Sequence, residues 1–132
     1  MKALDTNILI RFLTGDDAIQ AKKVYAIFKQ AETERKELFV PLPVVLEMIW
    51  VLESAYEIER ADIIRTLNDL LSMPVLKFDQ PAVVQQLVLC AQKNRVDLSD
   101  ILIAQSAKMS GCRTIITFDK KASKYDPFEL VD

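Results

Sequence analysis

Short apolar runs alternate along the chain with longer stretches in which apolar residues recur every three or four positions. The clearest long stretch is 59–71, whose apolar positions follow one helix face: Ile63, Ile64, Leu67, Leu70 and Leu71. The short runs, bounded by turn-forming residues, are typical of buried strands. The pattern therefore predicts strands separated by helices, the arrangement of an α/β fold with parallel crossovers.

The expected elements cover most of the sequence. We predict strands at 1–4, 38–40, 74–78, 113–118 and 128–131, the first of them short and buried. We predict helices at 8–13, from Asp16 or Asp17 to about 36, from 43 to about 56, 59–71, 81–94 and 99–110. Asp79 is the expected cap of the fifth helix. Gly111 is the expected end of the sixth, because glycine tolerates positive φ.

Composition adds that the chain is one globular domain, 1–132. Its 132 residues are 51% hydrophobic and 27% charged, without a repeat or a low-complexity linker. Asp5 and Arg11 interrupt the first apolar stretch, so no export signal is expected, and the apolar run around 44–52 is too short to span a membrane. We therefore expect a cytoplasmic protein with no membrane partner, in which Cys90 and Cys112 are small buried thiols.

The net charge of −2 gives no overall attraction to nucleic acid. Basic residues nevertheless cluster at 22–23, 93–95 and 120–124, where they either bind phosphate or form ordinary solvated helix faces. The chain has no histidine, and its two cysteines lack zinc-site spacing. Any metal chemistry is therefore expected to use oxygen ligands.

Two acids in the first half of the chain are candidates for such chemistry. Asp5 directly follows the first expected strand, at the junction where open α/β sheets bind ligands. A helix cap is the alternative for Asp5. Glu47 has only apolar residues three and four positions away, so we expect it on the buried face of its helix. A buried glutamate is rare unless it is paired or binds a metal, and a structural salt bridge is the alternative here.

Three acids in the second half are further candidates. Asp97 and Asp100 lie three positions apart at the start of the sixth helix, where capping and the helix dipole would also account for them. Asp100 heads an otherwise apolar stretch, which favours a position facing the core or a cleft. Asp119 follows the strand 113–118 as Asp5 follows the first strand, and a cap is again the alternative.

Together, acids at strand ends and on helix faces predict one shared anionic pocket. Like charges so close to one another repel unless a divalent cation holds them. Oxygen ligands without histidine or thiolate select hard ions, Mg²⁺ or Mn²⁺. Such ions polarise a phosphoryl oxygen and activate water, which is the chemistry of phosphodiester cleavage.

The segments that carry these acids resemble PIN-domain ribonucleases, specifically the VapC-type toxins of bacterial toxin–antitoxin pairs. The resemblance covers essentially the whole chain and is carried by Asp5-Thr6-Asn7 within 4–9, and by 11–17, 41–47, 96–104 and 114–121. It implies a three-layer α/β/α sandwich with a mostly parallel central sheet. It also implies that the acids meet at the carboxyl ends of the strands.

The resemblance further implies catalytic residues that are also ligands of Mg²⁺ or Mn²⁺: Asp5, Glu47, Asp100 and Asp119. Around them it implies supporting groups and secondary candidates: Thr6, Asn7, Thr117, Asp97 and Arg11. Arg11 would touch phosphate or an antitoxin acid, although a solvated face explains it too. The implied activity is metal-dependent endonuclease action on structured RNA such as tRNA or ribosomal RNA. The implied partners are a cognate antitoxin, which inhibits the enzyme, and a second copy in a homodimer.

Two other functions stay open on the sequence alone. An aspartyl-phosphate phosphotransferase would use Asp5 as its nucleophile. However, haloacid-dehalogenase-like sites need a second aspartate where Asn7 stands, and receiver-like sites need adjacent acids near the first strand. A non-catalytic binding module would instead use the acidic pocket to dock an arginine of a partner.

Overall fold

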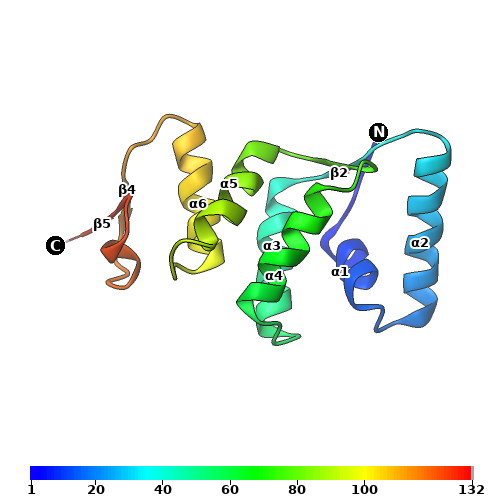
Figure 1. Cartoon of the computed structure of the whole chain (residues 1–132), viewed down its shortest axis with the longest axis horizontal. Coiled ribbons are helices and arrows are strands. Elements are labelled where there is room, and N and C mark those ends of the chain that lie inside the picture. Colours follow the sequence, from blue (N-terminus) through cyan, green and yellow to red (C-terminus); the bar gives the residue numbers. More distant parts are fainter. Residues whose placement is uncertain (132) are drawn as a thin grey trace. The chain divides into compact units, whose positions relative to one another are not determined.

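The computed structural model describes residues 1–131 and alternates strands with helices as the sequence predicts (Figure 1). The strands are β1 (Lys2–Ala3), β2 (Leu38–Val40), β3 (Leu76–Phe78), β4 (Ile115–Thr117) and β5 (Phe128–Leu130). The helices are α1 (Thr6–Thr14), α2 (Ala18–Thr33), α3 (Leu42–Ser54), α4 (Arg60–Leu71), α5 (Pro81–Ala91) and α6 (Leu98–Met109). A short 3₁₀ helix, η1 (Ala122–Lys124), was not predicted.

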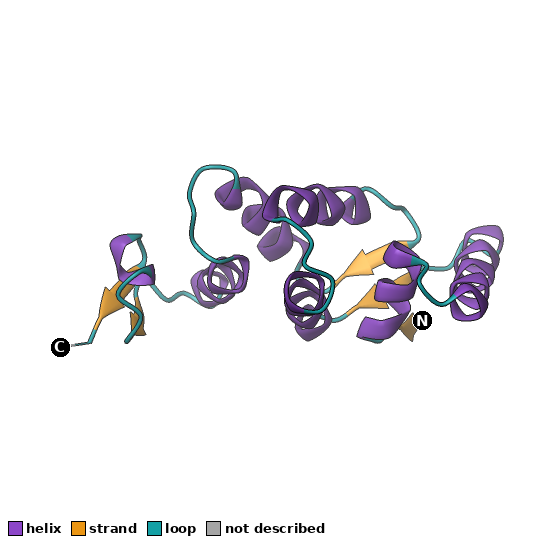
Figure 2. Ribbon diagram, turned by 90° about the horizontal axis from the view of Figure 1, so that it is seen from below, coloured by secondary structure: helices purple, strands orange, loops and turns teal. Residues whose placement is uncertain are grey.

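The described chain forms two compact units, the first being Met1–Pro81 and the second starting at Ala82. The first unit contains a parallel sheet in the order β1-β2-β3, with helices around it (Figure 2). Lys2 is in register with Leu38, which is in register with Leu76. Since the three strands run the same way, their carboxyl ends share one edge of the sheet. That edge leads into α1, α3 and the segment that follows Phe78.

The core of the first unit combines one face of each of α1, α3 and α4 with residues of α2 and the sheet, such as Phe28 and Val40. Its most deeply buried large side chains, each at most 1% exposed, are Leu9, Ile10, Met48, Ile49, Ile63, Leu67 and Leu70. The face of α4 predicted from its apolar spacing is therefore confirmed at Ile63, Leu67 and Leu70. These helices hold the loops at the carboxyl edge of the sheet.

The prediction that 1–4 is a buried strand is wrong for most of its residues. Met1 is 78% exposed, Lys2 and Ala3 are exposed, and only Leu4 is buried, at 6%. The reason is that, among the described residues of the first unit, β1 lies at an edge of the sheet, beside β2. Leu4 is the residue whose backbone N–H continues the pairing, donating to the Phe39 carbonyl over 2.8 Å.

The second unit contains α5, α6, η1 and a pair of parallel strands, β4 and β5. Gly111, with φ of 92°, follows the end of α6 as predicted. Cys112 lies in the connection to β4 and is exposed, and Cys90 is only partly buried, so the prediction of buried thiols is wrong. Within residues 1–131, no helix combines the length and the apolar character needed to cross a membrane.

Candidate functional site

Asp5 is the N-cap of α1, and its position follows from the turn between β1 and that helix. Its backbone is extended, with φ of −84° and ψ of 163°, and its Oδ1 accepts the Thr6 N–H over 2.8 Å. The capping alternative is therefore confirmed for one carboxylate oxygen. Asp5 is nevertheless exposed, as is Asn7, whereas Thr6 is 2% exposed. The cap orients Asp5 at the carboxyl edge of the sheet and leaves its other oxygen available to a ligand.

The prediction that Glu47 lies on a buried helix face is wrong. The buried face of α3 consists of Val44, Val45, Met48, Ile49 and Leu52, whereas Glu47 is exposed. Trp50, one of the apolar neighbours on which the prediction rested, is 64% exposed. A helix that is apolar nearly all round does not reveal from its sequence which side the core takes. Because Glu47 is exposed, its carboxylate stays hydrated, and no bound ion is needed to compensate for desolvation.

In the second unit, Asp97, Asp100 and Asp119 line one small cavity together with Lys121 and two apolar residues. Its volume, about 10 Å³, corresponds to roughly one water molecule. Asp97 is the N-cap residue of α6 and Asp100 lies in the first turn of the same helix. The structure thus brings together the three acids predicted from the second half of the chain.

Asp100 is the most electrostatically perturbed of these acids. Its partial burial raises the pKa of its carboxyl, and the nearby charges of Asp97 and Asp119 raise this pKa further. Asp97 was a secondary candidate, yet it makes no capping hydrogen bond with its side chain. Asp97 therefore occupies the N-cap position without a side-chain capping bond, and its charge contributes to the acidic cluster.

Asp119 is held by the turn that begins η1. Its Oδ1 accepts the N–H groups of Lys121, over 2.9 Å, and Ala122, over 3.2 Å. The hydroxyl oxygen of Thr117 accepts the Asp119 N–H over 3.0 Å. The Asp119 side chain therefore closes the turn that leads into η1, whose N-cap residue is Lys121, and Thr117 supports its backbone. Lys121 was not a predicted site residue, although the run Lys120-Lys121 beside Asp119 was a visible signal.

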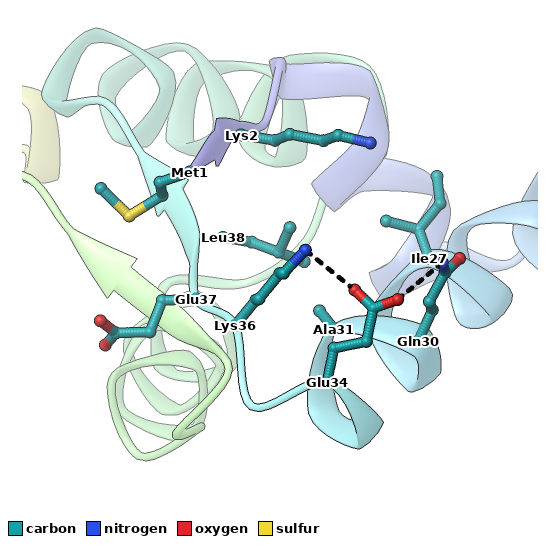
Figure 3. A pocket seen from close by; sticks show the side chains of 9 residues that line it. All are labelled: Met1, Lys2, Ile27, Gln30, Ala31, Glu34, Lys36, Glu37 and Leu38. Atoms are coloured by element: carbon teal, nitrogen blue, oxygen red, sulfur yellow. Dashed lines mark hydrogen bonds and ion pairs between the residues drawn. The ribbon is translucent and has the colours of Figure 1, made fainter.

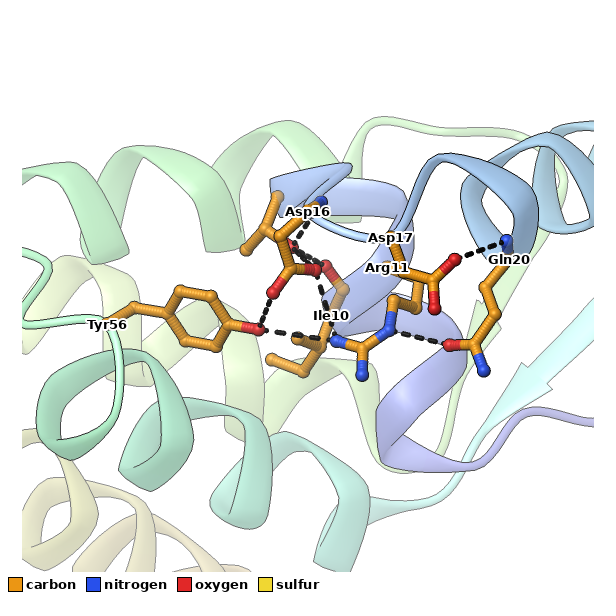
Figure 4. A network of polar contacts seen from close by, with 7 residues as sticks. Ile10, Arg11, Asp16, Asp17, Gln20 and Tyr56 are labelled. Atoms are coloured by element: carbon orange, nitrogen blue, oxygen red, sulfur yellow. Dashed lines mark hydrogen bonds and ion pairs between the residues drawn. The ribbon is translucent and has the colours of Figure 1, made fainter.

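Arg11 is bound within the first unit (Figure 4). Its Nη1 donates to Asp16 over 3.2 Å and to the Tyr56 hydroxyl over 3.3 Å, while its Nε donates to Gln20 over 2.7 Å. The solvated-face explanation is wrong, because the Arg11 side chain is only 25% exposed. Sequence reasoning missed Tyr56, which is distant in the chain and reaches Arg11 only after folding.

A separate cavity of about 460 Å³ contains none of the predicted site residues (Figure 3). It lies where β1 and β2 begin, beside the paired residues Lys2 and Leu38. On its rim Glu34 pairs with Lys36 over 3.3 Å and accepts a hydrogen bond from Gln30 over 3.2 Å. Parallel sheets bind ligands at the opposite, carboxyl edge, so this cavity is not the candidate site.

Within residues 1–131, no three acidic or cysteine side chains are arranged to hold a metal ion. Shared coordination by Asp5, Glu47, Asp100 and Asp119 therefore stays a prediction. The donor chemistry fits a hard cation, because the available groups are carboxylates and the chain has no histidine. The like-charged environment of Asp100 points the same way.

A family model described as "PIN domain" matches residues 2–127. The chain belongs to the PIN domain family. This PIN domain therefore has the three-layer α/β/α fold class predicted from the sequence, and the match spans both compact units. It is also similar to a VapC ribonuclease of Aquifex aeolicus (strain VF5). The two are 26% identical over 124 residues, which cover 94% of this chain and 91% of the relative.

Proposed function

We propose that this PIN domain is a Mg²⁺-dependent endoribonuclease toxin that cleaves structured RNA, either tRNA or ribosomal RNA, and is neutralised by a cognate antitoxin. Membership of the PIN family and the similarity to a VapC ribonuclease support a nuclease. The acidic groups of the chain support the dependence on a metal. A cytoplasmic location and a homodimer belong to the same proposal.

The proposed metal ligands are Asp5, Glu47, Asp100 and Asp119. Asp97 adds negative charge beside Asp100, and Thr6, Asn7 and Thr117 support the ligands. When bound, Mg²⁺ or Mn²⁺ would polarise the scissile phosphate and make water a better nucleophile.

The observation that carries the proposal is the environment of Asp100. Burial and two neighbouring carboxylates raise its pKa, so the ionised form is destabilised in the protein alone. Asp97, Asp100 and Asp119 line one cavity, so their like charges repel one another. A cation bound among these carboxylates would offset their mutual repulsion, because each carboxylate attracts it.

The remaining steps fall to side chains of this protein. The chain has no histidine, so a carboxylate is the side chain proposed to accept the proton of the attacking water. Lys121 lines the same cavity as the acids of the second unit, and its ammonium group can offset the charge of a bound phosphate.

The test is cleavage of total tRNA and ribosomal RNA by the purified protein, with Mg²⁺ and with EDTA. We expect cleavage only with Mg²⁺, and we expect the variants Asp5→Asn, Glu47→Gln and Asp100→Asn to lose most of it. Glu32→Gln, an exposed acid on α2, is the matched control and should cleave like the wild-type protein. Wild-type cleavage by all three site variants, or cleavage in EDTA, would overturn the proposal.

A second assay addresses the partner and the other two functions. Co-expression with the reading frame adjacent to its gene should yield a complex that no longer cleaves RNA. Partner binding that survives EDTA in a protein without nuclease activity would indicate a non-catalytic module instead. Labelling of Asp5 by acetyl phosphate would indicate a phosphotransferase.

A further inference from the structure

The first unit contains a polar cluster that ties together four segments of the chain. We call Arg11, Asp16, Gln20 and Tyr56 the Arg11 cluster (Figure 4). Arg11 comes from α1, Asp16 from the turn after it, Gln20 from α2 and Tyr56 from the connection between α3 and α4. The shortest contact is from the Tyr56 hydroxyl to Asp16 Oδ2, at 2.6 Å. A further hydrogen bond joins the Thr14 hydroxyl to Asp16 Oδ1 over 2.8 Å.

These contacts link the two helices of the first unit that carry proposed metal ligands. Asp5 caps the start of α1, and Arg11 lies in the second half of the same nine-residue helix. Glu47 is on α3, and Tyr56 lies two residues beyond the end of that helix, with its N–H bonded to the Val51 carbonyl over 3.4 Å. The hydrogen bonds among Arg11, Asp16 and Tyr56 therefore connect α1, which Asp5 caps, with α3, which carries Glu47.

A short helix needs such a tie. Helices of this length are marginal by themselves, so packing and end contacts determine where α1 lies. Leu9 and Ile10 anchor one face of α1 in the core, since they are 0% and 1% exposed. These apolar contacts favour burial but resist sliding weakly, because they are not directional. The Arg11 cluster supplies directional bonds at the end of α1 opposite Asp5.

The same contacts occupy two of the three guanidinium nitrogens through which Arg11 could bind RNA. Its Nε and Nη1 atoms already donate to Gln20, Asp16 and Tyr56. The Asp16 carboxylate also neutralises its charge. The role of Arg11 in these contacts is to hold neighbouring segments of the protein together.

We propose that the Arg11 cluster is a positioning device that sets the placement of Asp5 relative to Glu47. The inference rests on the proposed function, in which both carboxylates hold the metal ion. Arg11, Asp16 and Tyr56 are thus positioning residues, and none of them touches the substrate. Groups that orient metal ligands typically change metal affinity or activity by about 10-fold or more when they are removed.

The test uses the full-length variants Tyr56→Phe, which removes only the hydroxyl, and Asp16→Asn, which removes only the charge. We expect each to weaken Mn²⁺ binding, measured by calorimetry without RNA, by about 10-fold. We expect kcat for RNA cleavage to fall with little change in KM. Tyr25→Phe is the matched control, because Tyr25 is 56% exposed on α2, and it should leave both quantities unchanged. Urea unfolding identifies conditions in which every variant is folded.

Three results would separate the possible failures. Unchanged Mn²⁺ affinity and kcat in both variants, with an active wild-type protein, would overturn the positioning role alone. An increase in KM for Arg11→Gln, with Asp16→Asn and Tyr56→Phe unaffected, would place Arg11 on the RNA and also overturn it. A wild-type protein that neither binds Mn²⁺ nor cleaves RNA would overturn the proposed function, and this inference with it.

Discussion

The side chain of Asp79, at the end of β3, accepts a hydrogen bond from the backbone N–H of Leu42, 3.3 Å away at the start of α3. Asp79 was predicted to cap α5, the next helix in the chain. Pro41, the N-cap residue of α3, has no side-chain acceptor for the free N–H groups of that helix. Asp79 provides one from a neighbouring strand, since its own N–H bonds to the Val40 carbonyl over 2.9 Å.

We predict that Asp79→Ala lowers the free energy of unfolding by about 1 kcal/mol, the usual cost of losing a helix cap. Asp79→Asn should cost less, because the amide oxygen can still accept. Urea unfolding measures both values. Asp69→Ala, at an exposed position on α4, is the control and should stay within about 0.5 kcal/mol of wild type. An Asp79→Ala protein as stable as this control would contradict the capping role.

The two sides of α3 give a second prediction. Ile49 is 0% exposed and Trp50 is 64% exposed, although both are large apolar residues. Ile49→Ala should lower the free energy of unfolding by about 2–5 kcal/mol, since it leaves a cavity in the core. Trp50→Ala should change it by about 0.5 kcal/mol or less. The reverse order in urea unfolding would mean that α3 buries the side bearing Glu47 and Trp50.

Asp100 gives a prediction in which stability and function oppose each other. Its folded-state pKa is raised above the ordinary value of 3.8, so the metal-free protein loses stability as the pH rises through the folded-state pKa. At neutral pH, Asp100→Asn should therefore raise Tm in EDTA, on the order of a degree or two. It should also weaken the increase in Tm that Mg²⁺ causes in the wild-type protein.

Scanning calorimetry of wild type and Asp100→Asn, each with EDTA and with Mg²⁺, checks both effects. Glu129→Gln, at an exposed position in β5, controls for the loss of one negative charge. A lower Tm for Asp100→Asn in EDTA would show that the Asp100 charge stabilises the metal-free fold. That result would contradict the electrostatic description of the acid cluster.

Asp16 gives a prediction of the opposite sign. The hydrogen bond from Tyr56 lowers the pKa of Asp16 most, followed by the one from Thr14, with the Arg11 charge contributing less. A lowered folded-state pKa stabilises the protein above the ordinary value of 3.8, and this contribution is lost as the pH falls through the folded-state pKa. The Tm difference between wild type and Tyr56→Phe should therefore be constant near neutral pH and shrink below about pH 4. A difference independent of pH would mean that the Tyr56 hydroxyl does not interact with the Asp16 charge.

The sequence predicted the ends and faces of helices well where these features depend only on residues that are close together in the chain. Asp17 caps α2 through a 3.0 Å bond to the Gln20 N–H, and Gly15 ends α1 with φ of 62°. Both features depend on backbone geometry within a few residues. The spacing of apolar residues in α4 similarly determined its buried face, because its other positions are polar.

The errors lie where a side chain has a choice of partners. Asp79 caps a helix that is distant in sequence, and Glu47 lies on the solvent side of a helix with apolar residues on both sides. Arg11 finds Tyr56 across 45 positions of sequence. None of these pairings is encoded by spacing, since each depends on which surfaces meet in the folded unit.

The sequence by itself determined the α/β class, the order of the elements and the identity of the acids, because periodicity, caps and residue chemistry are local properties. It also determined that hard oxygen ligands are the available metal chemistry, since there is no histidine. Tertiary structure alone decided that Asp97, Asp100 and Asp119 line one cavity and that Arg11 is bound by Asp16, Gln20 and Tyr56. Burial and charge–charge repulsion depend on distances in space, and only folding sets those distances.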